Sequence, residues 1–100
     1  MNVKIFRLVS GEELIGKWEN DNDDSIDVEN PAVIVLNPSQ QGVQMGLMPF
    51  MAYAQDKIIN FKKSHIVATC AVETPLLNEY NRIFGSGIEI ANANDKLLKG

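Results

Sequence analysis

Two glycines five positions apart, Gly11 and Gly16, constrain this fold more than any other feature of the sequence. They lie in LVSGEELIGKW, Leu8 to Trp18, a segment otherwise typical of β-strands. Gly11 stands where the apolar pattern stops, which predicts a hairpin turn with a positive φ. Gly16 falls inside the second predicted strand, where glycine marks a bulge, a bend or the close approach of another backbone. A strongly bent strand is what a small closed barrel needs.

Apolar segments predict about five strands in the first 73 residues. They are 3–9, 13–18, 28–38, 43–53 and 65–72, and the polar, acidic segment 19–27 is predicted to be a loop. Residues 57–61 either finish the fourth strand or form their own, and both interpretations stay open. Pro31 lacks an N–H group, so it is predicted at a sheet edge or a bulge, and Pro49 predicts an edge or a break.

The fourth predicted strand is apolar on both of its faces. Alternation places six residues on one face: Val43, Met45, Leu47, Pro49, Met51 and Tyr53. A half-exposed strand should alternate more cleanly, so one face is expected to be covered by another chain or by the helix. Core packing and subunit contact remain equal alternatives.

The segment TPLLNEYNRIFG predicts a helix that ends before Gly85. We expect Thr74 as its N-cap and Pro75 at its first position. Its apolar stripe consists of Leu76, Leu77, Tyr80, Ile83 and Phe84. So short a helix must dock on a sheet or on a neighbouring subunit. The expected organisation is one domain, with a β-barrel over 1–73, a helix over 74–85 and an unassigned tail over 86–100.

Charge and composition exclude several classes of protein. Apolar residues make up 45% of the 100 residues, which predicts a folded domain, and the net charge of −4 argues against bulk coating of nucleic acid. No apolar run approaches the roughly 18 residues that span a bilayer, and no signal-peptide pattern opens the chain, so we expect a cytoplasmic protein without membrane contact. Cys70 is the only cysteine, and its apolar surroundings predict a buried, inert thiol.

No catalytic, metal or cofactor site is predicted. The only histidine, His65, follows Ser64, and neighbours along a strand point to opposite faces, so the two residues do not form a catalytic dyad. The acidic segment beginning at Asp21 has Ile26 and Ala32 where a calcium loop of the EF-hand type needs glycine and glutamate. We therefore expect a protein that is not an enzyme.

A basic segment, Lys62-Lys63-Ser64-His65, lies at a predicted loop between two strands. Basic and hydroxyl side chains on a loop are what contacts with phosphate and bases require. A solvated turn is the alternative interpretation.

These features together resemble the Sm, LSm and Hfq proteins. The pattern Leu8-x-x-Gly11-x-x-x-x-Gly16 is similar to their first motif, and Phe61 to Val67 resembles their second. The layout of the whole chain is most similar to small Sm-like proteins of tailed phages, including those of marine cyanobacterial phages. This resemblance implies a small, strongly bent five-stranded antiparallel barrel with a C-terminal α-helix.

The resemblance also implies assembly and a ligand. Subunits would join edge to edge through their fourth and fifth strands into a ring, with contacts from Met45, Leu47, Pro49, Met51, Tyr53, Ile66 and Ala68. The ring would bind RNA or DNA, in the first place RNA, for a role in its processing, through Lys62, Lys63, Ser64 and His65. Asp24 to Asp27 would repel phosphate. A phage protein of this kind would act in the host cytoplasm. The alternative is a structural or assembly protein that binds another protein through its apolar strand or helix.

Overall fold

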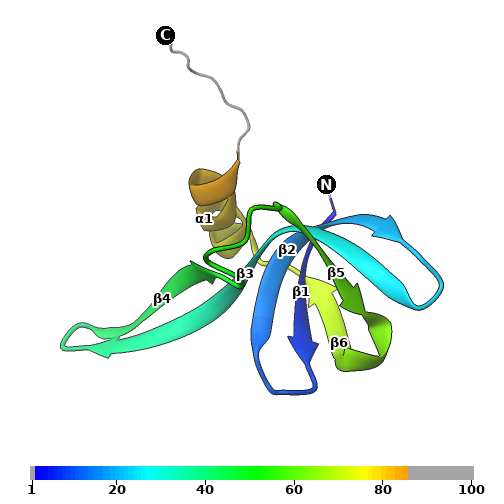
Figure 1. The fold of residues 1–100 in the computed structure, drawn as a ribbon. Coiled ribbons are helices and arrows are strands. Elements are labelled where there is room, and N and C mark those ends of the chain that lie inside the picture. The colour runs from blue at the N-terminus through cyan, green and yellow to red at the C-terminus, as the bar shows by residue number, and fades with distance from the viewer. Residues whose placement is uncertain (1, 86–100) are drawn as a thin grey trace, which may run out of the picture.

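Residues 2–85 form one strongly bent antiparallel sheet with the helix α1 packed against it (Figure 1). The computed structural model describes residues 2–85. Its elements are β1 (Val3–Leu8), β2 (Glu13–Asp21), β3 (Ser25–Ser39), β4 (Gly42–Pro49), β5 (Ile58–Lys62), the short 3-10 helix η1 (Lys63–His65), β6 (Ile66–Ala71) and α1 (Thr74–Phe84). The predicted mainly β fold with a C-terminal helix is confirmed, and the predicted tail 86–100 lies outside the described residues.

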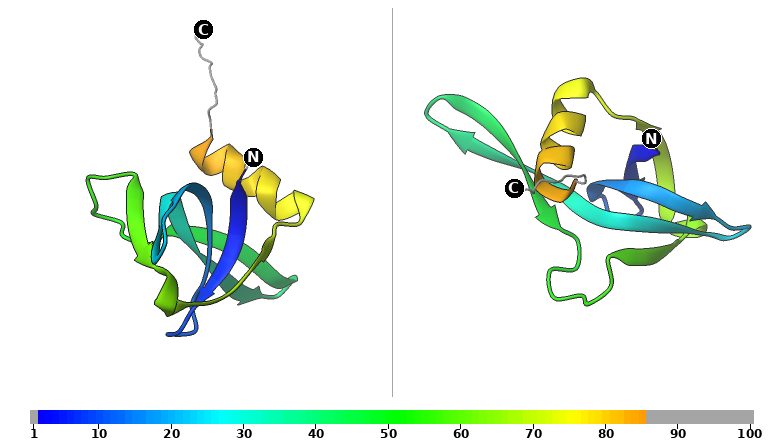
Figure 2. Two further views of the ribbon diagram at one scale, coloured as in Figure 1. Left: turned by 90° about the vertical axis from the view of Figure 1, so that its right-hand side faces the viewer. Right: turned by 90° about the horizontal axis from the view of Figure 1, so that it is seen from above.

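The sheet has the order β4-β3-β2-β1-β6, and β5 joins it through β3. One edge of β3 pairs first with β5, over Ser25 to Glu29, and then with β4, over Ala32 to Ser39. Residues 58–62 therefore form a strand of their own, and the sheet has six strands where five were predicted. Pairing between β2 and β3 ends at Val33, so the rest of β3 and β4 project as a two-stranded arm, here called the β3–β4 arm (Figures 1 and 2).

The predicted fourth strand is shorter than its apolar pattern indicates. β4 ends at Pro49, and Met51 and Tyr53 lie in the turns that follow it. The break predicted at Pro49 is confirmed, because proline has no N–H group with which to continue the ladder. The prediction that Met51 and Tyr53 share a strand face with Met45 is wrong.

The register between β2 and β3 shifts at Gly16. Ile15 is opposite Ala32 and Lys17 is opposite Glu29, so Asn30 and Pro31 together face Gly16. This is a β-bulge, and Asn30 has a left-handed backbone with φ of 51°. The predicted bend at Gly16 and the predicted bulge at Pro31 are thus one feature.

The structure shows why both positions of the opening motif are glycine. A Cβ atom at Gly16 would overlap Cγ1 of Val28 and would lie 3.3 Å from Cα of Pro31. Gly11 has φ of 100° in the β1–β2 turn, where its N–H donates to the carbonyl of Leu8 at 2.8 Å. Gly16 is therefore required by close approach and Gly11 by backbone conformation.

The bulge exchanges the faces of β3. Before it, Ile26 and Val28 pack inside the bend, and after it Val33 packs against the same inner cluster while Ala32 faces the helix. An extra residue shifts the two-residue alternation by one, so even-numbered side chains change face. The strand β3 therefore contributes side chains to both apolar cores.

The inner core fills the concave side of the sheet. It consists of Phe6, Leu8, Leu14, Ile26, Val28 and Phe61. The rings of Phe6 and Phe61 meet edge to face with centroids 5.4 Å apart, a favoured aromatic geometry. This contact links β1 to β5, two strands that do not pair with each other in the sheet.

The second core lies between the sheet and α1 (Figure 2). Val3, Ile15, Ala32 and Tyr80 are buried there. The helix thus docks on the sheet, as its apolar stripe predicts, although Ile83 of that stripe is exposed. The N-cap is Glu73, one residue before the predicted Thr74.

Tyr80 fastens the helix to the bulge. Its hydroxyl lies 2.9 Å from the carbonyl oxygen of Glu29 and 3.1 Å from that of Asn30, and it donates its proton to this pair. Burial raises the pKa of Tyr80, so the hydroxyl keeps its proton. The helix therefore stabilises the bend directly as well as through apolar contact.

The prediction for Cys70 is wrong, because its side chain is exposed. β6 pairs only with β1 among the described strands, and every residue of β6 after Ile66 is exposed. An apolar segment indicates burial only when another layer covers it, and nothing in residues 2–85 covers β6.

We expect Gly16→Ala to lower the free energy of unfolding by about 1–3 kcal/mol, because its methyl group meets the fully buried Val28. Urea unfolding followed by circular dichroism measures the change. Gly46→Ala is the matched control, since a Cβ there meets its nearest atom at an ordinary 3.4 Å. Equal stability of the two variants would contradict the role given to Gly16.

Tyr80→Phe should lower the free energy of unfolding by about 1 kcal/mol, because two carbonyls lose their hydroxyl donor while the ring remains. The same substitution at the fully exposed Tyr53 should change nothing. Thermal unfolding of both variants provides the comparison, and an unchanged melting temperature for Tyr80→Phe would refute the link between helix and bulge.

Candidate functional site

The predicted basic loop is the short 3-10 helix η1, which connects β5 to β6 (Figure 1). The N–H of Lys63 donates to the carbonyl of Asp24 at 2.9 Å, and the N–H of Val9 donates to the carbonyl of His65 at 2.8 Å. These two bonds hold η1 between the β1–β2 turn and the β2–β3 turn. Ser64 lies in η1 as well, so the strand geometry assumed for the pair Ser64 and His65 is wrong.

The structure brings all four predicted contact residues together at this turn. Lys62, Ser64 and His65 are exposed, and Lys63 is half-buried. The ammonium group of Lys63 forms an ion pair with the carboxylate of Asp21, 42 positions away in the sequence. One of the two positive charges at the turn is therefore already neutralised.

Amide side chains hold the acidic β2–β3 turn in place. Asn60 of β5 donates to Asp27 at 2.7 Å and to the hydroxyl of Ser25 at 3.0 Å. Asn20 donates to the other oxygen of Asp27 at 3.3 Å, and Asn22 donates to Ser25 at 3.2 Å. The acidic segment is thus a structured hairpin end packed beside η1, where the sequence predicts a solvated loop.

A further cation lies close to the same hairpin. Nζ of Lys4 lies 5.3 Å from the ring centroid of Trp18, a cation–π contact. Lys4, Trp18 and Asp21 line one shallow hollow of about 220 Å³. The indole N–H of Trp18 is buried and has no hydrogen-bond partner within residues 2–85. The sequence carries no signal for this grouping, which depends on the register between β1 and β2.

Lys17 forms ion pairs with two carboxylates beside the bulge. Its Nζ lies 3.5 Å from Glu19 and 3.9 Å from Glu29. A hydrogen bond with Glu19 raises the pKa of Glu29, and partial burial and the charge of Glu19 act in the same direction. The two carboxylates therefore compensate the positive charge of Lys17, which adds little attraction for phosphate.

The sheet has two open ends. β6 pairs only with β1, and β4 and β5 pair only with β3, so within residues 2–85 the outer edges of these strands have no backbone partner. Neither β4 (GVQMGLMP) nor β6 (IVATCA) contains a charged residue. Natural proteins usually protect free edges with charge or irregularity, so uncharged edges of this length are suited to pairing with another strand.

The predicted interface residues divide between these edges and one turn. Met45, Leu47 and Pro49 lie on β4, Ile66 and Ala68 lie on β6, and Met51 and Tyr53 lie in the turns after β4. Tyr53 is fully exposed, and Met45 and Met51 are about half exposed, with exposed fractions of 52% and 53%. Within residues 2–85, β4 and β6 stand at opposite ends of the strand order.

No protein-family model and no curated protein matches the sequence. Within residues 2–85, the single helix is too short and too polar to cross a membrane. Function is therefore inferred from η1, the open strand edges and the charges around them.

Proposed function

We propose that this chain is an Sm-like protein that assembles through its strand edges into a ring and binds nucleic acid, in the first place RNA, at η1. The observation that carries the proposal is the pair of uncharged, open edges at the two ends of one bent sheet. The turn at Gly11 and the bend at Gly16 agree with the layout that the Sm resemblance implies. In this proposal β4 and β5 together correspond to the fourth strand of the barrel.

Two different edges favour a closed ring. When β6 of one copy pairs with the β4 or β5 edge of the next, the same contact can be repeated head to tail. Such a heterologous contact closes into a ring if the rotation per subunit divides a full turn. Each copy then has a partner at both ends, and no uncharged edge stays open to uncontrolled association.

A ring would present η1 once per subunit. Ser64 and His65 are exposed on η1, and Lys62 is exposed directly before it. Together they offer a cation and hydrogen-bonding groups to phosphate and sugar. The ion pair between Lys63 and Asp21 lowers the net charge of each site. Binding should therefore depend on repetition around the ring and weaken steeply with added salt.

A second candidate is a phage assembly protein that binds another protein. The observation in its favour is the β3–β4 arm, whose large apolar side chains Leu36, Val43, Met45 and Met48 are each more than half exposed. Exposed apolar groups gathered on one element are typical of protein contact surfaces.

Sedimentation velocity at micromolar concentration tests the assembly. We expect a species several times the 11.1 kDa of one chain. Lysines introduced on the open edge by Val67→Lys and Ala68→Lys should reduce it to a monomer with an unchanged circular dichroism spectrum. Thr74→Lys with Asn78→Lys, at exposed positions of α1, adds the same charge and should leave the assembly intact. A monomeric wild-type chain would end the ring proposal.

Titration of a labelled single-stranded RNA at low salt tests the ligand. Lys62→Ala with Lys63→Ala should weaken binding about tenfold or more, whereas Asp21→Asn should strengthen it by releasing Lys63. Lys57→Ala with Arg82→Ala removes the same charge from other elements and should have a small effect. No binding, or equal loss in both double variants, would reject η1 as the site.

The second candidate predicts a bound protein partner instead. Its binding should persist after nuclease treatment and should be lost in the variant with Val43→Asp and Met45→Asp.

A further inference from the structure

An apolar groove lies between the β3–β4 arm and the β1–β6 end of the sheet. It has a volume of about 730 Å³, and its lining includes Ile5, Ile34, Leu36, Met45, Cys70 and Leu76. This size falls within the roughly 300–1,000 Å³ of clefts that bind small ligands. The groove is distinct from η1 and lies on the helix-facing side of β1, where Ile5 belongs to the same alternation as Val3.

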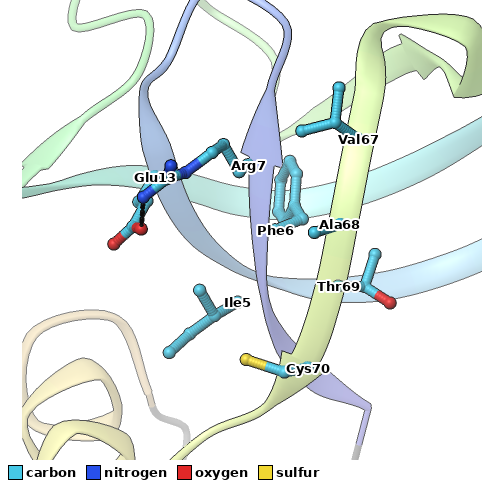
Figure 3. A pocket seen from close by; sticks show the side chains of 8 residues that line it. All are labelled: Ile5, Phe6, Arg7, Glu13, Val67, Ala68, Thr69 and Cys70. Atoms are coloured by element: carbon cyan, nitrogen blue, oxygen red, sulfur yellow. Dashed lines mark hydrogen bonds and ion pairs between the residues drawn. The ribbon is translucent and has the colours of Figure 1, made fainter.

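A second hollow of about 360 Å³ continues this surface (Figure 3). Ile5, Arg7, Glu13 and Cys70 line both cavities. Ile5 and Cys70 lie side by side because they are register partners in β1 and β6. The two hollows thus form one surface, long enough for more than a single side chain.

The rim of the groove is acidic. Its charged residues are Arg7, Glu12, Glu13 and Glu73, and Arg7 forms an ion pair with Glu13. The carboxylate of Glu12 accepts a hydrogen bond from the hydroxyl of Ser10 at 2.6 Å. Neither Glu12 nor Glu73 has an ion-pair partner within residues 2–85, so two negative charges remain uncompensated beside apolar walls. A complementary ligand combines aliphatic groups with positive charge.

We propose that this groove binds a peptide segment in which adjacent aliphatic residues are flanked by lysine or arginine. The aliphatic side chains lie against Leu36, Met45 and Leu76, and the flanking cations meet Glu12 and Glu73. This inference does not depend on ring formation or on binding at η1. One segment with this composition, Lys96-Leu97-Leu98-Lys99, occurs in the sequence itself and supplies a natural probe.

Fluorescence anisotropy with a labelled synthetic peptide of residues 91–100 tests the proposal. The receptor is the full chain with Leu97→Asp and Leu98→Asp, so that its own copy of the segment does not compete. We expect saturable binding, and a loss of about tenfold when Glu12→Lys and Glu73→Lys reverse the rim charges. A peptide in which both lysines are changed to glutamate should bind weakly to the receptor that keeps Glu12 and Glu73. It should bind more tightly to the receptor that carries Glu12→Lys and Glu73→Lys.

Asp23→Lys with Asp56→Lys is the matched control, because it makes the same change in net charge at exposed positions that do not line the groove. Its affinity for the peptide should fall much less than that of the rim variant. The groove also contains the only cysteine, so bound peptide should slow the reaction of Cys70 with a thiol reagent.

Absence of binding up to millimolar peptide would overturn the proposal. So would equal binding of the acidic peptide, or an unchanged affinity after reversal of the rim. Sedimentation of the same samples measures assembly separately, so failure of the groove and failure of the ring are distinguishable. A peptide that binds with unchanged Cys70 reactivity would place the contact elsewhere and would also count against the groove.

Discussion

The whole arrangement depends on the close approach of β2 and β3 at Gly16. Gly16 leaves room for this approach because it lacks a Cβ atom, and the extra residue in the Asn30–Pro31 bulge opposite it bends β3. Tyr80 then donates its hydroxyl to the carbonyls at the bulge. The sheet, its two cores and the docked helix all meet at this one crossing.

The bend also decides the electrostatics of η1. Because the sheet curls, the β1–β2 turn and the β2–β3 turn come to lie on either side of η1, and backbone hydrogen bonds fix them there. The same curvature brings Asp21 to Lys63. The turn contains two lysines, but Asp21 compensates the charge of one of them. Its attraction for phosphate is therefore weaker than the sequence alone indicates.

After Val33, β3 no longer pairs with β2 and pairs only with β4. This separation produces the β3–β4 arm, on which the apolar side chains of Leu36, Val43, Met45 and Met48 are each more than half exposed. It also opens the groove between the arm and β6, and within residues 2–85 it leaves the outer edge of β4 without a backbone partner. The exposed arm and the groove beside it are thus consequences of one change of pairing partner.

The sequence by itself determined the features that a single residue imposes on its own backbone. These include the turn at Gly11, the irregularity at Gly16 and the helix that stops before Gly85, whereas the sequence left open an edge or a bulge at Pro31 and an edge or a break at Pro49. Only the tertiary structure decided which apolar segments are covered and which charges are paired. Cys70 is exposed although its segment is apolar, and Lys63 is neutralised by a residue 42 positions away. The reason is physical: glycine and proline act through local φ, ψ and N–H requirements, whereas burial and charge compensation depend on neighbours that only the folded chain brings together.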